Sequence, residues 1–387
     1  MERPQPISVK PLQIVPWIAL GAFVLLWRHK PAVPSLSDPR ELSPEGFDKA
    51  EPGRGRAAPK VRQIPHRGWR DIAWRVYQEI GKDRLPIVAG GVTFYTLLAL
   101  FPALGAFVAL YGLIADVHAV ETQIAQLSLI LPPDVVALLA DQMRRLAAAH
   151  DSTLSLTFIF SLALAIWSAN AGVNALFDGM NIAYGEAEKR NWFKRRGLTL
   201  AFTLGLVAVV TALSILLIAV PLRLSDYGLA PSEVWWIPFS WIAALAMIVA
   251  SFAALYRFGP SRAQARWAWV WPGAFAAAAG WIAGSVAFSI YVSRFANYAD
   301  AYGPLGTVIA FMVWIWVSAM AILLGAELNA EIEHQTAVDT TTGPEAPMGA
   351  RGAAMADTVG LAFKGFHFFK RWRTPSAPWR TLRKTAP

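Results

Sequence analysis

The chain has 387 residues, of which 55% are hydrophobic and only 16% are charged, well below the roughly 25% charge of an average soluble domain. It contains no cysteine, which excludes disulfides, thiolate nucleophiles and cysteine-bound metal centres. The net charge is +9, but the Lys and Arg residues lie between apolar blocks and in the tails, not in a basic stretch interleaved with aromatic residues. The composition therefore predicts an integral membrane protein with no nucleic-acid partner.

The N-terminal 68 residues form an extension with one short apolar stretch. Residues 12–27 would reach about 24 Å as a helix, less than the roughly 30 Å of a bilayer core. The charged triplet Arg28-His29-Lys30 follows directly and no small-x-small cleavage site is evident, which argues against a cleaved signal peptide. Two alternatives stay open: a seventh membrane helix with its N terminus outside, or an interfacial segment. Residues 31–68, rich in Pro, Gly, Arg and Lys, are predicted to be a disordered linker.

Residues 69–333 contain six apolar blocks with the length of membrane-spanning helices, since about 20 residues cross a bilayer core of about 30 Å. The blocks are residues 87–115, 154–174, 198–220, 235–258, 272–292 and 305–325. They predict an all-α membrane protein built as a six-helix transmembrane bundle. Residues 334–387 are predicted to be a basic, mostly disordered tail.

The Lys and Arg residues alternate from one side of the six blocks to the other. Residues 28–84, the loops after the second and fourth blocks, and the C-terminal tail together carry 29 of the 35, whereas the loops on the opposite side carry 4. Short cytoplasmic loops are enriched in Lys and Arg. The pattern therefore places both ends of the six-helix unit, including the C terminus, in the cytoplasm of a multi-pass protein.

Two further regions are amphipathic and too polar to span a membrane. In residues 69–84, Ile72, Val76 and Ile80 recur at helical spacing among charges, which predicts a helix lying on the inner membrane surface. After the first block, residues 117–131 and 134–149 are predicted to be two helices outside the membrane, broken by a pair of prolines. They form either a cap over the helix ends or a docking surface.

Several segments, in their order and spacing over about 265 residues, resemble the YihY/BrkB family of bacterial inner-membrane proteins, which are sometimes labelled ribonuclease BN-like. The segments are Ala89-Gly90-Gly91-Val92-Thr93-Phe94-Tyr95, Trp167-Ser168-Ala169-Asn170, Trp271-Pro272-Gly273-Ala274, Phe288-Ser289-Ile290-Tyr291, Tyr302-Gly303-Pro304-Leu305-Gly306 and Leu324-Gly325-Ala326-Glu327-Leu328-Asn329-Ala330. The resemblance implies six helices, both ends in the cytoplasm, a location in the bacterial inner membrane, and a role in the cell envelope.

The sequence offers no motif for catalysis. The six histidines are all more than ten residues apart, and no HxHxDH or HExxH string is present, so a clustered metal site for a ribonuclease is not predicted. A phosphate-binding GxxxxGK[ST] loop and a GxSxG nucleophile elbow are also missing. We therefore expect no enzyme, no ribonuclease, no cofactor and no metal, and we regard an intramembrane hydrolase as disfavoured.

A stripe of polar residues at the cytoplasmic end of the second block is the most suggestive feature. Its members are spaced by four, four and three residues, so they share one helical face, and polar groups at this depth must face protein or water. Acidic residues end the sixth block and arginines begin the third at the same level. The candidate vestibule comprises Asn170, Asn174, Asp178, Asn181, Glu327, Arg190, Arg195 and Arg196. It would bind an anionic headgroup, or it serves as interhelical hydrogen bonding alone.

Three other features fall within the membrane blocks or at their outer ends. The first block is long and contains Gly90, Gly91, Thr93, Tyr95 and Pro102, which predicts either a kinked helix lining a site or a passive tilted helix. In the fifth block, Gly280 and Gly284 form a small-xxx-small pair for close helix packing within one subunit or in a homo-oligomer. An aromatic hairpin at the outer side serves as an anchor or contacts a headgroup; it comprises Tyr291, Arg294, Tyr298, Tyr302, Gly303 and Pro304.

Intramembrane polarity without catalytic motifs favours a protein that aids transport or homeostasis of a lipid or another envelope component, with membrane lipids as its partners. The alternative is a membrane scaffold that recruits envelope-biogenesis proteins through the tails and outer helices. The sequence specifies neither the substrate, nor an energy source, nor the oligomeric state.

Overall fold

The computed structural model describes residues 43–114, 151–220, 236–295 and 305–363, and every element within these ranges is helical apart from turns and a single isolated bridge. Two short helices, α2 (Pro44–Ala50) and η3 (Val61–Gln63), precede the amphipathic helix α3 (His66–Lys82). The longer helices are α4 (Leu85–Ile114), α7 (Asp151–Ala183), α8 (Trp192–Ser214) with its π-helical continuation η4 (Ile215–Ala219), α10 (Trp236–Phe258), α11 (Trp267–Phe295) and α13 (Leu305–Glu333).

The six long helices are each long and apolar enough to cross a membrane, which confirms the predicted all-α membrane bundle. Two of them extend beyond the predicted blocks: α7 continues to Ala183 and α13 to Glu333. Sequence reasoning ended both helices where the apolar run ended. The helices continue because backbone hydrogen bonding does not depend on apolarity once the polar side chains find partners.

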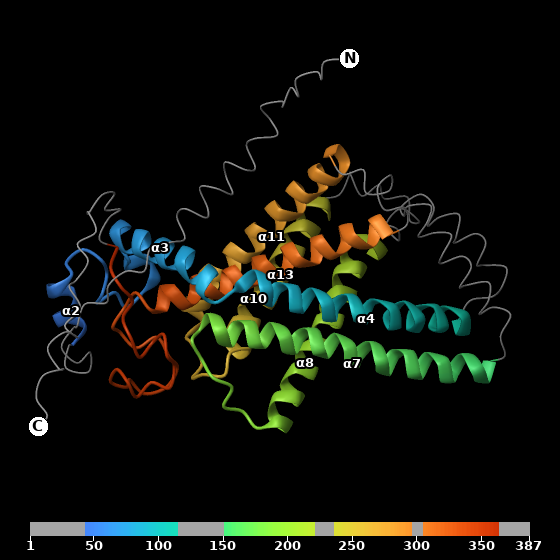
Figure 1. The fold of residues 1–387 in the computed structure, drawn as a ribbon, viewed down its shortest axis with the longest axis horizontal. Coiled ribbons are helices and arrows are strands. Elements are labelled where there is room, and N and C mark those ends of the chain that lie inside the picture. The colour runs from blue at the N-terminus through green and yellow to red at the C-terminus, as the bar shows by residue number, and fades with distance from the viewer. Residues whose placement is uncertain (1–42, 115–150, 221–235, 296–304, 364–387) are drawn as a thin grey trace, which may run out of the picture. The chain divides into compact units, whose positions relative to one another are not determined.

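The central helix of the bundle is α13, which packs against α3, α4, α7 and α11. The helices α4 and α7 run antiparallel beside one another for much of their length (Figure 1). By contrast, α8 buries only Thr199 and Thr203 among its described residues and exposes a run of Leu and Val side chains along its length. In a membrane protein, lipid chains cover such a face.

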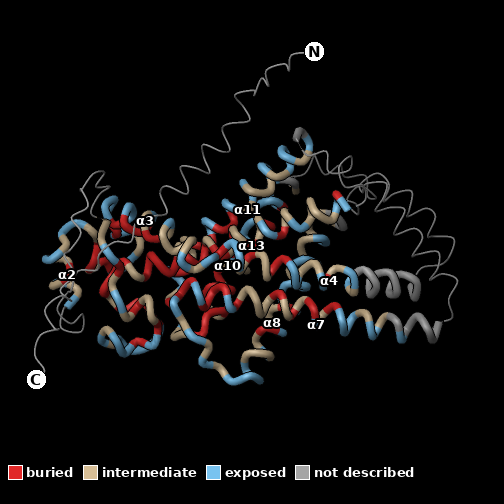
Figure 2. Tube along the Cα trace, in the orientation of Figure 1, coloured by how far each residue is buried: buried red, intermediate tan, exposed pale blue. Residues whose placement is uncertain are grey.

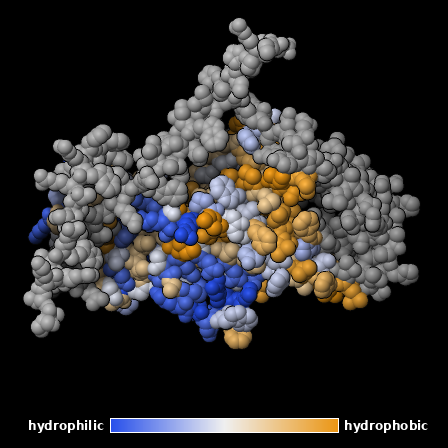
Figure 3. All heavy atoms as spheres, viewed as in Figure 1, coloured by the Kyte–Doolittle hydropathy of each residue, from blue (hydrophilic) through white to orange (hydrophobic). Residues whose placement is uncertain are grey.

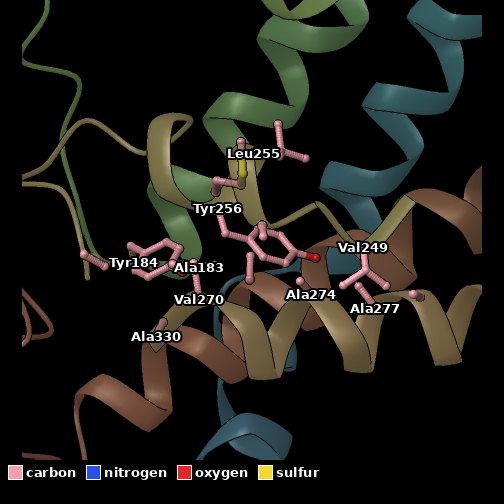
Figure 4. Packing of buried hydrophobic residues seen from close by; sticks show 14 of the residues in the cluster. Ala183, Tyr184, Val249, Leu255, Tyr256, Val270, Ala274, Ala277 and Ala330 are labelled. Atoms are coloured by element: carbon pink, nitrogen blue, oxygen red, sulfur yellow. The ribbon is translucent and has the colours of Figure 1, made fainter. Parts of the chain in front are cut away.

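Burial is concentrated toward one end of the bundle, where the red segments of α3, α13 and the adjoining loops lie in Figure 2. The largest core cluster there contains Phe177, Tyr184 and Tyr256, packed among small residues of α10, α11 and α13 (Figure 4). The Tyr256 hydroxyl donates to the backbone oxygen of Ile322 at 2.7 Å, which satisfies its one polar atom. Pairs of aromatic and small residues thus fix α10 against α13.

Close approach of α11 to α13 depends on glycines. A side chain at Gly273 would meet the carbonyl oxygen of Gly325 and the Asn329 side chain, and one at Gly284 would meet Val317, all well inside 3.0 Å. The Asn329 amide spans the break that Pro272 introduces, since it accepts from Gly273 N at 2.7 Å and donates to Val270 O at 2.9 Å. The predicted small-residue face is therefore used for packing within one chain.

The segments flanking the bundle differ from the expectation of disorder. Within the described range, residues 334–363 fold against α3 and against the loop between α10 and α11, and residues 43–65 also form ordered turns and short helices. Few apolar residues hold them. Buried arginines do so instead: Arg56 donates to the carbonyls of Gln335 and Gly360, and Arg351 donates to those of Ala337 and Ala356. A compositional argument for disorder counts apolar residues and misses backbone carbonyls satisfied by charged donors.

Several predicted segments lie outside the described residues. These are residues 12–27, the two outer helices at 117–131 and 134–149, and residues 364–387 of the tail. Their predicted roles stay predictions.

Candidate functional site

Charged and polar side chains gather at one end of the bundle, which we call the polar end. It comprises α3, residues 184–191, 259–266 and 334–363, and the helix termini that these segments join. On the face shown in Figure 3, hydrophilic residues lie to the left and lower middle and hydrophobic residues to the right. The predicted vestibule residues all belong to this end.

The predicted polar stripe lies on the single helix α7, and α8 supplies a cation to it. Arg195, in the first turn of α8, donates through Nε to Asn174 Oδ1 at 3.2 Å and through Nη2 to Asp178 Oδ1 at 2.7 Å. Asn174 also donates to the backbone oxygen of Asn170 at 3.1 Å. The side chain of Asp178 is 54% exposed and that of Arg195 is 24% exposed. This ion pair therefore joins two spanning helices and is open at the surface.

The remaining stripe residue, Asn181, belongs to a loop network that meets Arg195 through Glu188, whose Oε2 lies 3.9 Å from Arg195 Nε. Asn181 donates to Glu188 at 3.2 Å and accepts from Ser261 N at 2.8 Å. Glu188 accepts two side-chain bonds from Arg190, whose Nη2 also donates to Gly259 O at 2.8 Å. The hydrogen bonds from Arg190 lower the pKa of Glu188 to about 2. Arg190 is thus committed to closing the loops, and it is not available to a ligand.

The start of α8 also presents aromatic side chains beside its cations. Asn191 caps the helix by accepting from Lys194 N at 2.8 Å. The Arg196 guanidinium lies 5.7 Å from the centre of the Trp192 ring. Trp192 and Phe193 are among the exposed large hydrophobic residues. Aromatic residues beside cations are typical of the membrane–water interface.

Glu327 does not join the stripe. Its side chain is completely buried on α13, and neither carboxylate oxygen has a hydrogen-bond partner. It lies one turn from Leu323, which packs with Leu85 and Ala89 of α4, and one turn from Glu331, which binds Arg75 of α3, whereas Arg195 belongs to α8. The predicted vestibule is therefore two separate places: a surface ion pair between α7 and α8, and a buried carboxyl on α13.

Sequence reasoning missed three buried ion pairs that hold the polar end together. Arg75 of α3 donates to Glu331 and, at 2.8 Å, to Gln335, while Arg262 forms a two-bond pair with Glu333. The third pair joins Arg54 to Asp71 at 2.6 Å. Helical spacing could have indicated which helix faces carry Arg75 and the glutamates. One sequence cannot show, however, which residues pair when the partners lie 17 to 256 residues apart.

The Arg262 pair is also stacked on an aromatic ring. Its guanidinium lies 4.2 Å from the centre of the Tyr184 ring. Burial disfavours its charge, but the Glu333 carboxylate raises the pKa of Arg262 above its usual value, and burial raises the pKa of the Tyr184 phenol. The pair is permanently ionised and structural.

The first span does not present its polar groups as a site. α4 runs through Pro102 as one continuous helix (Figure 1), and the hydroxyls of Thr93 and Thr96 donate back to Ala89 O and Val92 O, both at 2.8 Å. A side chain added at Gly90 or Gly91 would meet no atom within 4 Å. Tyr95 is exposed next to Phe94. α4 is thus a continuous helix, and the choice between a helix that lines a site and a tilted, kinked but passive one stays a prediction.

Little of the predicted outer hairpin falls within the described residues. Tyr291 is exposed near the end of α11. The side chain of Arg294 and all of Tyr298, Tyr302, Gly303 and Pro304 lie outside the description. Within the described ranges, no group of three or more His, Asp or Glu residues is placed to hold a metal ion.

The fold and the charge distribution define a multi-pass helical membrane protein with one polar end. The family model described as Virulence factor BrkB matches residues 76–349, and the chain belongs to this family. No solved structure matches the chain.

Relatives from several bacteria match shorter or longer parts of the chain. A ribonuclease-like protein, YfkH, of Bacillus subtilis is 34% identical over 176 residues, which cover 44% of this chain and 64% of the relative. A UPF0761 membrane protein of Albidiferax ferrireducens is 25% identical over 320 residues, covering 80% of this chain and 70% of that protein. A UPF0761 membrane protein of Aeromonas salmonicida is 22% identical over 262 residues, covering 66% and 86%.

Proposed function

We propose that this protein resides in the bacterial inner membrane with its polar end in the cytoplasm and aids the movement or homeostasis of an anionic lipid or a similar amphipathic envelope component. The distribution of 29 Lys and Arg residues on one side against 4 on the other supports this orientation. The family and the relatives' names support a membrane role without specifying the cargo.

One observation carries the proposal: the surface ion pair of Arg195 with Asp178 between α7 and α8. A partly exposed pair contributes little to stability, on the order of 0–1 kcal/mol, so its partners exchange readily. The guanidinium presents a fork of donors that matches a phosphate. Exposed Trp192 and Phe193 lie in the same helical turn, and the apolar face of α8 continues from it. A headgroup could thus replace Asp178 while its acyl chains lie along α8.

The test measures lipid retention by native mass spectrometry of the full chain released from nanodiscs of phosphatidylethanolamine and phosphatidylglycerol. Arg195→Gln should lose most of the retained anionic lipid. The matched control is Lys194→Gln, which removes an equal charge from the neighbouring exposed residue and should retain the lipid. Equal losses in both variants would mean only general attraction of basic residues to an anionic surface, and would overturn the site.

A second variant separates binding from packing. Asp178→Asn removes the competitor for Arg195, so retention of anionic lipid should rise. If Asp178→Asn instead leaves lipid unchanged and lowers thermal stability, the pair only joins the helices. The scaffold hypothesis would then gain support, since it predicts lipid retention independent of both residues.

A further inference from the structure

Glu327 is the residue of the Leu324–Ala330 segment that packing does not explain. Gly325 allows α11 to approach, Asn329 bonds the backbone of α11, and the alanines and leucines enter core clusters. Glu327 is 0% exposed, and both of its carboxylate oxygens lack a hydrogen-bond partner. An ionised carboxylate in such a place costs several kcal/mol. It therefore needs a neutralising partner.

The position of Glu327 on α13 fixes what faces it. Leu323, Glu327 and Glu331 are four residues apart and share one helical face. Leu323 packs on Leu85 and Ala89 of α4, and Glu331 binds Arg75 of α3. Glu327 therefore lies between an apolar layer and an ion-pair layer, next to the turn that joins α3 to α4.

Among the described residues, the neighbouring cations are occupied or face solvent: Arg84 of the α3–α4 turn is exposed, and His334 lies 3.5 Å from Glu331. Arg75 is committed to Glu331, and Lys82 pairs with Glu79 at 2.5 Å. On α7 and beyond, Asp178 pairs with Arg195, and the Tyr184 ring lies under Arg262, which binds Glu333. Tyr256 of α10 donates its hydroxyl proton to Ile322. The spans Leu85–Ala103 and Trp267–Ser293 bring no charged residue at all.

We propose that Glu327 is a proton-binding site within the membrane domain, loaded from the aqueous side of the polar end through Asp83. A proton is the ligand that one carboxyl can hold alone, whereas a metal ion requires several oxygen or nitrogen ligands. Within the described residues, no such group of acidic and histidine side chains surrounds Glu327.

Asp83 is suited to pass the proton. It is the C-cap residue of α3, partly exposed, in the turn that lies next to Glu327. Burial, and then the charge of Glu79, raise the pKa of Asp83 to about 6, so it exchanges protons near neutral pH. In the loading step, Asp83 takes a proton from hydronium in the aqueous phase, and its carboxylic acid then gives that proton to the Glu327 carboxylate through an intervening water molecule, because no hydrogen bond joins the two carboxyls. Asp83 is left ionised and ready for reloading.

Proton binding at Glu327 does not require a bound lipid. A role of this proton in driving the movement of a cargo does rest on the proposed function. An internal carboxyl that gains and loses a proton is a common coupling device in membrane transport proteins. It would supply an energy source in a protein whose sequence has no nucleotide-binding loop.

Infrared difference spectroscopy of the full chain in nanodiscs tests the site, because a protonated carboxylic acid has a C=O stretching band that a carboxylate lacks. The wild type should show this band at neutral pH, and Glu327→Gln should lose it. The control is Glu345→Gln, which removes an exposed carboxylate of the polar end without freeing a buried cation and should keep the band. A band that persists in a folded Glu327→Gln variant would overturn the proposal.

A second variant tests the same proton path if Glu327→Gln does not fold. Asp83→Asn, at a partly exposed position, should slow deuterium exchange of the band by roughly tenfold or more, the effect of a kinetic barrier higher by about 1.4 kcal/mol. An unchanged exchange rate would remove Asp83 from the path.

The choice of ion is tested by replacing choline chloride with sodium chloride at constant pH. The band should stay. If sodium abolishes it, Glu327 is a sodium site and the proton assignment is wrong. In the lipid-retention assay, Glu327→Gln should keep its lipid and Arg195→Gln should keep the infrared band, so failure of one proposal is distinguishable from failure of the other.

Discussion

Replacement of Gly273 by Ala tests the packing that positions the polar end. The added Cβ would collide with the Gly325 carbonyl and with the Asn329 amide. Overpacking of this kind costs about 1–3 kcal/mol. Displacing Asn329 also breaks two buried hydrogen bonds, worth about 0.5–1.5 kcal/mol each. The better helix propensity of Ala returns about 1 kcal/mol. We expect a net loss of about 1–5 kcal/mol in the free energy of unfolding.

The chain contains a matched control two turns along the same helix. A Cβ at Gly280 would meet only Ala321, at 3.9 Å, which is ordinary contact. Gly280→Ala should therefore leave stability unchanged or raise it by up to about 1 kcal/mol. Thermal unfolding in detergent, followed by the fluorescence of the 17 tryptophans, compares the two variants. A Gly273→Ala protein as stable as the wild type, or equal losses in both variants, would refute the assignment of the close contact.

Four further substitutions examine other parts of the structure. Glu331→Gln leaves the buried Arg75 without a carboxylate, so we expect a loss of about 3–5 kcal/mol, measured by thermal unfolding, whereas Glu327→Gln breaks no ion pair and should change stability by less than about 1 kcal/mol. Gly91→Ala should raise the melting temperature, since the position is open and Ala favours a helix by about 1 kcal/mol over Gly. Loss of lipid retention despite the higher melting temperature would support the hypothesis of a hinge in α4. The raised pKa of Asp83 means that its contribution to stability is full below about pH 4 and falls as the pH rises to about 6. Melting temperatures across this window should fall less in Asp83→Asn than in the wild type, and an identical slope would contradict the raised pKa.

The polar stripe shows how far the sequence could go toward a site. Spacing alone placed Asn174 and Asp178 on one face, because helical periodicity is a local property. The same reasoning grouped Glu327 with them because it lies at the same depth in the bilayer. Depth does not specify direction, and α13 turns Glu327 toward α3 and α4 instead.

Residues 334–363 show the opposite limit. Their composition predicts disorder because they bury few apolar side chains. They fold because Arg56 reaches the carbonyl oxygen of Gly360, 304 residues away, and Arg351 reaches that of Ala337 within the segment. Thr336 and Thr340 close further bonds to Ala58 and Glu333. Bonds of this kind depend on the assembled helix ends and leave no periodic trace in the sequence.

The sequence by itself determined the six helices and the segregation of basic residues to one side, because a bilayer imposes length and apolarity on each span locally. Only the tertiary structure decided which polar groups pair and which are left alone. Arg75 meets Glu331 across 256 residues, Arg195 meets Asp178 at the surface, and Glu327 meets no partner. The reason is physical: pairing depends on how helices rotate and pack against one another, and that is set by contacts such as Gly273 on Gly325, which no single helix contains.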